Sequence, residues 1–511
     1  MRNLLLCILL LSSLPTCVAR CFALPVIDGI FNDWSVPLAT DPAGDSSGPL
    51  DVRSLSASSA GSVLFVRIEI ATARNLSSGP SGETSLVLSI SNVAAGRTLA
   101  IDFRNRTARV NGTLVSWPSI NFVCLPTFAS TSFELQADLA TINAAPGTQV
   151  RLQFSGADAL STPAFFTLSG PAQAPAHLET DRSPCAFVRV ASLNTFFSGI
   201  IDPARQPAIT RLLRAVRADV YVFQEEYDST LSDAQAFFAS TDPKSDGVPW
   251  NVIRQGELII ASQWQLIPVP LNSSHFGAVV RVPGGPDVLV VTLHPKCCGY
   301  TGSAEDVQRI DQASGAIASF NQFRAGTLSP ALAPYRNAPA ILSGDWNLVG
   351  SATPLDLWRG TPGLTRTQLR QASAYDYWTW ASPNGLGFWP GELDLVLFDR
   401  PRIFAKRVFT LNSATLDPAE LSSLGLLASD SSASDHLLMV ADFSVFAAAD
   451  FNGDALVEDT DFSLFAGAYN LLDCADPAMT SGCPADLNFD GAVDDSDFVL
   501  FVGAYNELVC P

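Results

Sequence analysis

The sequence predicts a multidomain chain with three folded parts: an N-terminal β-sandwich, a central layered α/β domain and a C-terminal pair of small helices. Residues 24–170 alternate short apolar runs with turns rich in Gly, Ser, Asn and Pro, a pattern typical of β-sheet. Residues 185–445 alternate strand-like and helix-like apolar patterns, and residues 446–511 hold an internal repeat of acidic loops. A length of 511 residues also exceeds what one hydrophobic core usually serves.

The first segment, residues 1–23, is predicted to be a secretion signal. Arg2 gives it a positive start, and Leu4–Leu14 form an apolar run. Ala19 and Ala23 are small residues at which cleavage can occur. The apolar run is too short to span a membrane, and no later stretch of about 20 apolar residues follows. We therefore expect a secreted protein with no transmembrane segment.

The cysteines bear on the same expectation, because export permits disulfides. Removal of residues 1–23 takes away three of the ten cysteines, and the odd number that remains leaves at least one thiol without a partner in the chain. Cys474 and Cys483 bracket a short loop and are the predicted bridge. Cys297 and Cys298 are adjacent, so they form either a strained vicinal bridge or two separate thiols.

The net charge of the chain restricts the kinds of surface through which it can bind a partner. A net charge of -20 argues against a protein that grips nucleic acid through a broadly basic surface. The charge is uneven, because Arg407 is the last basic residue and everything after it is acidic or neutral.

The N-terminal domain is predicted to be a β-sandwich from its strand runs and the lack of a strong helical pattern. The clearest runs are 62–70, 84–90 and 98–103. Its opening contains Ile27-Asp28-Gly29, Asn32-Asp33-Trp34, an acidic turn from Asp41 to Asp45, and Asp51-Val52. This opening resembles family 9-type carbohydrate-binding modules, which implies a glycan ligand. An unrelated sandwich with acidic turns is the alternative.

Residues 171–184, with three prolines among small residues, are predicted to be a linker. In the central domain beyond it, Ile209, Leu212, Leu213 and Val216 recur at helical spacing on one face. The predicted strands of this domain are 186–194, 219–223, 288–293 and 340–342.

These strands run into polar residues, and strand ends are where layered α/β folds place their chemistry. One such residue alone is more often a turn cap than a ligand. Here, however, the polar motifs recur along the domain, and they contain two of the chain's four histidines. The candidate site residues are Asn194, Glu225, His294, Asp345, Asn347, Asp394, Asp435 and His436.

This ordered series of motifs resembles the endonuclease/exonuclease/phosphatase superfamily over nearly all of residues 185–445. The resemblance implies a four-layer α/β sandwich of the deoxyribonuclease I-like kind and phosphoester hydrolysis with Mg²⁺ or Mn²⁺. By position, Glu225, Asp435 and Asn194 are the expected metal ligands. Such hard cations prefer oxygen ligands, and a bound cation neutralises the phosphate.

The same resemblance assigns the acid–base groups. Asp345 is the expected water-activating base, and Asn347 donates to the phosphate. His294 and His436 donate to phosphate oxygens, one of them as the general acid. Asp394 orients His436 and raises its pKa.

Two positions depart from the pattern of the superfamily and remove positive charge near the phosphate. Glu392 stands where many members have a basic residue, and Gln263 stands where many have Arg or Lys. Lys296 and Arg309 follow His294 in the sequence and are expected to compensate as substrate-binding residues.

The C-terminal repeat predicts two calcium loops of the EF-hand kind, 36 residues apart. Their expected ligands are Asp450, Asn452, Asp454, Leu456, Glu458 and Asp461 in loop one and Asp486, Asn488, Asp490, Ala492, Asp494 and Asp497 in loop two. The loops and the apolar helices after them resemble dockerin modules, which implies a small EF-hand-like helical pair and a cohesin-like protein partner. Loop one has Ala455 where Gly usually makes the turn, which predicts a weaker site.

The expected function is hydrolysis of an extracellular phosphodiester, with a nucleic acid as the favoured substrate. A phosphatase or a sphingomyelinase-like phospholipase of the same superfamily is the alternative within the enzyme class. A non-catalytic surface or scaffold protein is the alternative outside it, and the complete set of candidate site residues argues against it.

Overall fold

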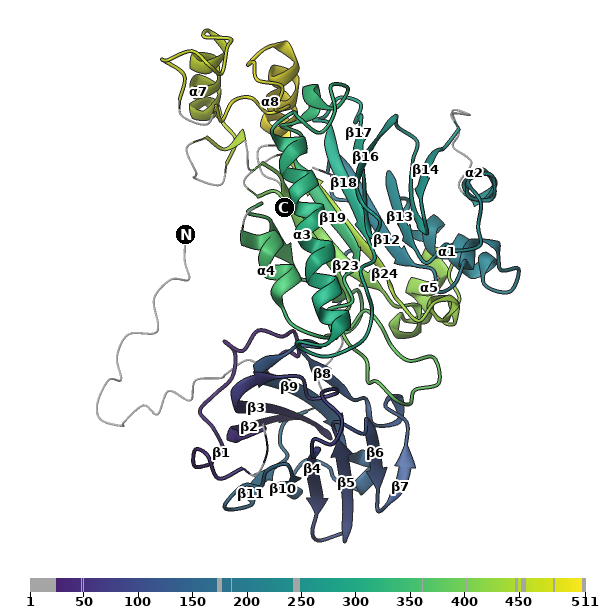
Figure 1. Ribbon diagram of the computed structural model, residues 1–511, viewed down its shortest axis with the longest axis vertical. Coiled ribbons are helices and arrows are strands. Elements are labelled where there is room, and N and C mark those ends of the chain that lie inside the picture. Colours follow the sequence, from purple (N-terminus) through teal and green to yellow (C-terminus); the bar gives the residue numbers. More distant parts are fainter. Residues whose placement is uncertain are drawn as a thin grey trace, which may run out of the picture.

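The computed structural model describes residues 24–46, 48, 50–171, 177–184, 186–241, 249–360, 362–400, 402–445, 449–451, 456–480 and 483–507. The predicted signal segment 1–23 lies outside these residues. The β-sandwich lies at one end of the central domain and the C-terminal helices lie at the other (Figure 1). Among the described residues, no helix combines the length and the apolar character needed to cross a bilayer.

Two antiparallel sheets make up the N-terminal domain. The first has the order β1 (Ala39–Thr40), β2 (Val52–Ala60), β3 (Val63–Arg74), β9 (Ser130–Asp138) and β8 (Val123–Leu125). The second has the order β11 (Ala164–Thr167), β10 (Gln149–Gly156), β4 (Leu86–Asn92), β5 (Arg97–Asp102), β6 (Thr107–Val110) and β7 (Thr113–Val115). Two short 3-10 helices, η1 (Pro118–Ile120) and η2 (Leu139–Ile142), connect strands.

The two sheets share one apolar core. Alternate residues of β4, such as Leu88 and Ile90, are buried against residues of β3, such as Val66 and Ile68. Strands β3, β4 and β5 lie on the three runs that the sequence predicts, so that prediction is confirmed.

The central domain is built on two larger sheets. The first has the order β14 (Asn251–Gln255), β15 (Leu258–Ser262), β13 (Val220–Gln224), β12 (Val188–Asn194), β24 (Leu438–Ser444), β23 (Phe404–Leu411) and β21 (Arg370–Gln371). The second has the order β16 (Leu266–Asn272), β17 (His275–Val280), β18 (Val288–Leu293), β19 (Ala340–Asp345), β22 (Asp394–Phe398) and β20 (Thr365–Thr367). Strands β12 and β13 run parallel, as do β18 and β19, so each pair ends at the same edge of its sheet.

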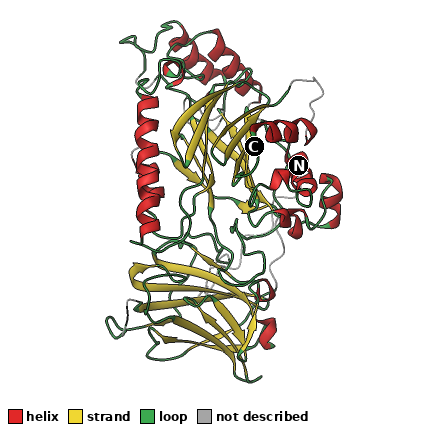
Figure 2. Ribbon diagram, turned by 45° about the vertical axis from the view of Figure 1, so that its right-hand side comes forward, coloured by secondary structure: helices red, strands yellow, loops and turns green. Residues whose placement is uncertain are grey.

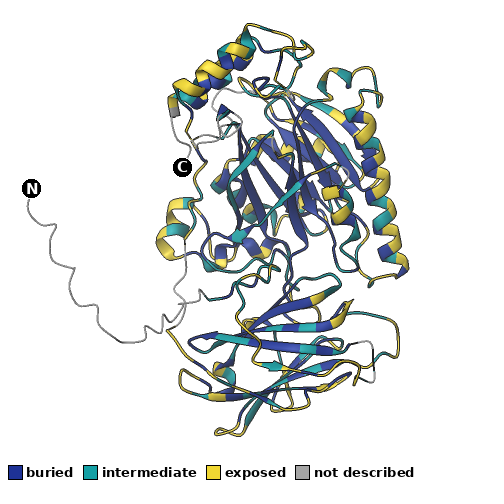
Figure 3. Ribbon diagram, turned by 90° about the vertical axis from the view of Figure 1, so that its left-hand side faces the viewer, coloured by how far each residue is buried: buried dark blue, intermediate teal, exposed yellow. Residues whose placement is uncertain are grey.

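Helices cover the outer face of each sheet. They are α1 (Gln206–Val216), α2 (Leu231–Thr241) and α5 (Pro418–Leu424) on the first sheet and α3 (Ala304–Arg324) and α4 (Thr353–Gly360) on the second. Short 3-10 helices η3 (Gly199–Ile201), η4 (Ala333–Tyr335), η5 (Ser413–Thr415) and η6 (Asp430–Ala433) lie in the connections. One apolar core lies between the two sheets and another lies under each helical layer, so the predicted four-layer sandwich is confirmed (Figure 2). Figure 3 shows buried strands in the middle of this domain and exposed outer helix faces.

The predicted helical face is also confirmed, because Ile209, Leu212, Leu213 and Val216 are the buried residues of α1. Residues 177–184 do not form a free linker but pack on the central domain. Arg189, which is buried in β12, donates to the Thr180 carbonyl. It also forms a bidentate ion pair with Asp442 of β24.

The β-sandwich is bonded to loops of the central domain. Asn75 donates from Nδ2 to the carbonyls of Val349 and Gly350, at 3.0 and 2.9 Å. Thr127 donates from Oγ1 to the Leu348 carbonyl at 2.7 Å. In return, Trp389 of the central domain is buried in the apolar core of the sandwich. The edge of the central sheets at which the parallel strand pairs end therefore faces the sandwich (Figure 1).

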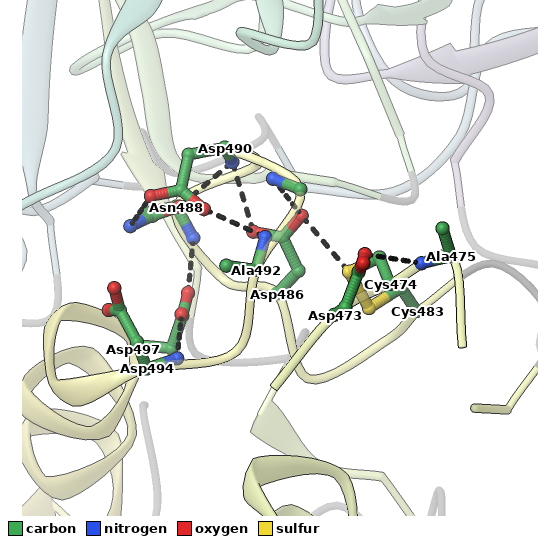
Figure 4. Close-up of a disulfide and its surroundings, with 11 residues drawn as sticks. Asp473, Cys474, Ala475, Cys483, Asp486, Asn488, Asp490, Ala492, Asp494 and Asp497 are labelled. Atoms are coloured by element: carbon green, nitrogen blue, oxygen red, sulfur yellow. Dashed lines mark hydrogen bonds between the residues drawn. A yellow bond between two sulfur atoms is a disulfide. The ribbon is translucent and has the colours of Figure 1, made fainter. Parts of the chain in front are cut away.

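The C-terminal part contains α7 (Asp459–Tyr469) and α8 (Asp495–Glu507). Their phenylalanines pack the two repeats together, with the rings of Phe465 and Phe501 centred 5.0 Å apart. The Cys474–Cys483 disulfide is present, as predicted (Figure 4).

Candidate active site

Five strands bring these candidate residues to one edge of the two sheets. Asn194 ends β12, and Glu225 comes directly after β13, its parallel neighbour. Asp345 ends β19, and Asp394 begins β22 directly opposite it in the antiparallel ladder. His294 follows β18 in the same way. Because strands of both sheets end here, residues distant in sequence become neighbours.

Asn194 links the carboxylates of the two sheets. Its Nδ2 donates to Glu225 Oε1 at 3.1 Å and to Asp345 Oδ2 at 3.2 Å. The Asn194 side chain is fully buried, so its amide is held in one orientation by these bonds and by the Phe196 N–H that its Oδ1 accepts. Asn194 therefore fixes Glu225 relative to Asp345.

Asp345 lies between two imidazoles. Its Oδ2 is 3.5 Å from His294 Nε2 and 3.7 Å from His436 Nε2. Its Oδ1 accepts the Asn347 backbone N–H at 2.8 Å. Burial raises the pKa of Asp345 to about 6, against the opposing pull of the two histidines.

A carboxylate behind each imidazole fixes the orientation of its ring. His436 Nδ1 donates to Asp394 Oδ2 at 2.8 Å, and His294 Nδ1 donates to Glu257 Oε1 at 3.1 Å. Both rings therefore turn Nε2 toward Asp345. Asp394 thus has the position that the sequence assigns it, behind His436.

Both histidines are held in the charged form by this arrangement. Burial alone would lower the pKa of His294, but the hydrogen bond to Glu257 and the charges of Asp345 and Glu225 raise it to about 9. Burial also opposes the charge on His436, yet Asp394 and Asp345 raise its pKa to about 10. At neutral pH the site therefore holds two imidazolium donors around one carboxylate.

Glu257 is a residue of the site that the sequence pattern does not indicate. It sits at the turn of the β14–β15 hairpin, where β15 pairs with β13 so as to bring Glu257 opposite Glu225. Its Oε2 accepts the Glu225 backbone N–H at 2.6 Å while its Oε1 holds His294. The only signal in the sequence is an acidic residue at a Gly-containing hairpin turn, which is a common and unspecific feature.

Asp435 fits a cation ligand. Its Oδ2 accepts the Trp380 indole N–H at 2.9 Å, but its Oδ1 is buried and has no hydrogen-bond partner among the described residues. Burial raises its pKa, and the nearby Glu225 carboxylate raises it further. Buried polar atoms are normally satisfied, so an oxygen of this kind beside a second carboxylate is what a divalent cation would coordinate. Glu225 and Asp435 offer carboxylate oxygens, as Mg²⁺ and Mn²⁺ prefer. Asn194 differs from its expected ligand role, because its Oδ1 accepts the Phe196 N–H and its Nδ2 faces Glu225, so it positions that carboxylate.

The remaining expected residues take different positions. Asn347 and Lys296 line the cavity, and Asn347 Nδ2 donates to the Pro295 carbonyl at 3.1 Å. Arg309 does not reach the cavity: it is fully buried and donates to the carbonyls of Lys296 and Cys298. Arg309 therefore supports the loop that carries Lys296, and this corrects its expected role as a substrate contact.

One of the two departures from the superfamily pattern, Glu392, has a structural explanation. Glu392 forms an ion pair with Arg366 through both of its carboxylate oxygens, so its charge is neutralised locally. Cys297 and Cys298 are free thiols whose Sγ atoms lie 2.8 Å apart, which settles the two alternatives of the sequence in favour of separate thiols in this structure.

The site opens into a cavity of 470 Å³ between the central domain and the sandwich. Ser77 and Thr127 of the sandwich form part of its wall, beside Gly391. A Cβ on Gly391 would overlap Thr127 Cγ2, so glycine is what allows the sandwich to come this close. No sequence pattern indicated that the N-terminal domain would form part of the active site.

A strained turn borders the cavity next to Glu225. Phe196, Phe197 and Ser198 have φ values of 53°, 52° and 62°, and Glu225 itself has a φ of 64°. Left-handed backbone at non-glycine residues costs on the order of 1–3 kcal/mol each. Arg205 holds the turn by donating to the carbonyls of Phe196 and Phe197, and Glu225 Oε2 accepts the Phe197 N–H at 3.1 Å.

The second acidic loop of the C-terminal part is folded around its own backbone. Asp486 accepts the backbone N–H groups of Asp490 and Gly491, and Asp497 accepts those of Asn488 and Asp494, at 2.9–3.1 Å (Figure 4). Burial and the neighbouring carboxylates raise the pKa of Asp486 to about 7 and that of Asp497 to about 6.

In loop one, Asp461 accepts the N–H groups of Phe451 and Glu458, and the bond from Glu458 is the counterpart of the bond from Asp494 to Asp497 in loop two. Its expected ligands Asn452 and Asp454 lie outside the described residues. Asp450 and Leu456 are described, and both make contacts within the chain.

Comparison with known proteins agrees with this geometry. Residues 191–436 match the Endonuclease/Exonuclease/phosphatase family. No curated protein matches the chain. Among solved structures, a 3′–5′ exonuclease from Neisseria meningitidis is 16% identical, with 50% of this chain and 99% of that chain covered and a TM-score of 0.34. A mannosyl-6-phosphatase from Bacteroides thetaiotaomicron (15% identity, 50% and 99% coverage, TM-score 0.33) and a beta toxin from Staphylococcus aureus (15%, 50% and 99%, 0.33) are also similar. The chain therefore carries an endonuclease/exonuclease/phosphatase domain over residues 191–436 and is a phosphoester hydrolase.

Proposed function

We propose that the enzyme is a secreted phosphodiesterase that uses a divalent cation and acts on nucleic acid. The observation that carries the hydrolytic chemistry is the position of Asp345 Oδ2, 3.5 and 3.7 Å from the Nε2 atoms of two charged histidines. One carboxylate with two imidazolium donors supplies a base for water and donors for a phosphate within one small volume.

Asp345 is the water-activating base of this proposal. Its pKa of about 6 leaves it ionised at neutral pH yet basic enough to accept a proton from water. Asn194 holds Oδ2 from one side, and the Asn347 N–H holds Oδ1 from another, so the carboxylate cannot rotate freely. A substrate phosphate that sits against both Nε2 atoms would therefore meet a water already oriented by Asp345.

His294 and His436 donate to the phosphate oxygens, and one of them protonates the leaving oxygen as the general acid. Their Nδ1 atoms are already engaged by Glu257 and Asp394, so Nε2 is the atom left for substrate. Lys296, exposed at the cavity, offers a further positive charge to the phosphate.

Glu225 and Asp435 would hold Mg²⁺ or Mn²⁺, and Asn194 would keep the Glu225 carboxylate in place. When bound, such an ion neutralises phosphate charge and polarises the phosphorus–oxygen bond. The unpartnered Asp435 Oδ1 supports this assignment, because the ion gives this buried oxygen a partner that the described residues do not supply.

A diester is favoured over a monoester because the cavity lies between two domains and has room for groups on both sides of a phosphate. A phosphatase and a sphingomyelinase-like phospholipase use the same chemistry and are the alternatives. Secretion is proposed from residues 1–23, and the glycan ligand of the sandwich stays a prediction from its opening motif.

We also propose that the C-terminal loops bind Ca²⁺ and form the docking part of the chain, with a cohesin-like protein as the partner. Support comes from the repeated ligand spacing and from the absence of Lys and Arg after Arg407. It also comes from two equivalent hydrogen bonds, from the Glu458 N–H to Asp461 and from the Asp494 N–H to Asp497. Without a cation, these carboxylates repel one another.

Replacement of His436 or Asp345 by Ala is expected to lower kcat by ~10²–10⁴-fold, because each removes one positioned proton donor or acceptor. Initial rates on a dinucleotide with Mg²⁺, together with circular dichroism to verify folding, measure this. His177→Ala is the matched control, because His177 contacts Ser373 and Glu420 away from the cavity. Unchanged rates in both active-site variants would contradict the assignment.

Asp394→Asn is expected to move the alkaline limb of the pH–rate profile to lower pH. Asp394 is the main charge that raises the pKa of His436, so its neutralisation lets that pKa fall and the imidazolium is lost earlier as pH rises. The test is kcat against pH for the wild type and the variant. An alkaline limb that stays in place, or moves upward, would show that His436 does not act as the charged donor.

Calcium is expected to protect α7 and α8 from hydrogen exchange in the full chain. Asp497→Asn removes a ligand charge and should abolish the calcium effect on α8, while Asp473→Asn, outside the ligand positions, should retain it. Extracellular loops can have Kd values up to ~10⁻³ M, so millimolar calcium is required. Full protection of both helices in chelator would remove calcium from the account.

A further inference from the structure

An aromatic pair lies at the rim of the catalytic cavity, beside the expected metal ligand. Phe197 is 63% exposed and Tyr227 is 48% exposed, and their ring centroids lie 5.9 Å apart. Both residues line the cavity. Resting on the function proposed above, we propose that Phe197, with Tyr227 beside it, is the platform on which a nucleobase of a single-stranded substrate stacks.

The exposed ring of Phe197 has no evident folding benefit. Three consecutive left-handed residues, Phe196 to Ser198, are needed to turn the chain here, and the result is an apolar ring in water. The turn binds Glu225 and Asn194 through the N–H groups of Phe197 and Phe196, which accounts for its strained backbone. It does not account for the exposed ring of Phe197, which a contact outside the chain would explain. Arg205 and Glu225 hold the turn, so the ring is preorganised.

The backbone of Phe197 adjoins the reacting centre, and the residue lines the same cavity as Glu225 and His294. Glu225 Oε2 accepts the Phe197 N–H at 3.1 Å, while Glu225 Oε1 lies 3.7 Å from His294 Nε2. A group stacked on Phe197 is therefore attached to the same substrate nucleotide as the phosphate, or to the next one. Aromatic rings bind any base through its flat face, which gives affinity without sequence preference.

The shape and charge of the surroundings favour a single strand over a duplex or a lipid. Thr127 and Ser77 of the sandwich wall one side of the cavity, whose 470 Å³ is the size of about one nucleotide, and this favours a single strand at the phosphate. The net charge of -20 opposes approach to an anionic bilayer or to the dense charge of a duplex.

The test uses a dinucleoside monophosphate, which has a single diester, and two analogues in which one or the other base is replaced by hydrogen. In the wild type, loss of the stacked base should lower kcat/KM at least about fivefold. Phe197→Ala should lower kcat/KM for the parent by a similar factor and should show no further loss on that analogue. Phe197→Tyr should behave as the wild type. Phe165→Ala is the matched control, because Phe165 is an exposed ring of β11 that does not line the cavity.

Equal kcat/KM for the parent and both analogues would overturn the stacking platform while leaving the phosphodiesterase intact. The same conclusion follows if a simple dialkyl or aryl diester is hydrolysed but the dinucleotide is not. A rate on sphingomyelin vesicles that falls selectively in Phe197→Ala would assign the ring to lipid and also overturn it. Hydrolysis of no diester at all would contradict the proposed function itself.

Discussion

Carboxylate repulsion at the shared edge of the two central sheets is the constraint on which the rest of the site depends. The carboxylates that meet there are Glu225, Glu257, Asp345, Asp394 and Asp435. The negative charge of each carboxylate is balanced in a different way. Glu257 and Asp394 are paired with an imidazole, and Asp345 is shared between both imidazoles. For the charge that remains, on Glu225 and Asp435, the described part of the chain offers only His294 as an ion-pair partner, 3.7 Å from Glu225.

This arrangement gives His294 and His436 both their charge and their orientation. The same carboxylates that raise the pKa values of His294 and His436 also orient their rings, so charge and direction are set together. The residual negative charge then favours binding of a cation. Asp435 Oδ1, which is buried without a hydrogen-bond partner among the described residues, is the oxygen expected to coordinate it. The charge distribution that orients the two imidazoles is thus also the one that favours the proposed cation.

The β-sandwich contributes residues to the wall of the catalytic cavity. Its Asn75 and Thr127 bond to residues 348–350, in the loop that continues from Asp345 and Asn347. The catalytic loop is therefore held from one side by the central sheet and from the other by the N-terminal domain. The cavity acquires a second wall from the same contact, and this restricts which substrates fit.

The residue pattern predicts the site well where apolar periodicity and a polar strand end coincide. The strands that end at or just before Asn194, Glu225, His294 and Asp345 are buried along their whole length and are rich in apolar residues, so the apolar pattern locates their ends. Apolar periodicity does not predict the role of Glu257, because this residue lies in a hairpin turn and its position depends on strand register. It does not predict the burial of Arg309 either, because that burial depends on how the loop of Lys296 folds over it.

Other features depend on contacts that leave no periodic trace in the sequence. The left-handed turn at Phe196–Ser198 contains no glycine, so nothing in its residue types predicts a positive φ. The docking of the sandwich rests on side chains such as Asn75 and Thr127 that resemble ordinary turn residues. Tertiary contacts decide these features, and local sequence preferences do not.

The central claim is that a divalent cation sits between Glu225 and Asp435, beside Asp345 and its two histidines. The most direct measurement is the anomalous scattering of Mn²⁺ in crystals of the full chain, compared with crystals of Glu225→Gln. The account predicts one strong peak in contact with a Glu225 carboxylate oxygen and with Asp435 Oδ1, lost in the variant while any ion in the C-terminal loops stays. A peak in those loops alone, or one at the active site that persists in Glu225→Gln, would contradict it.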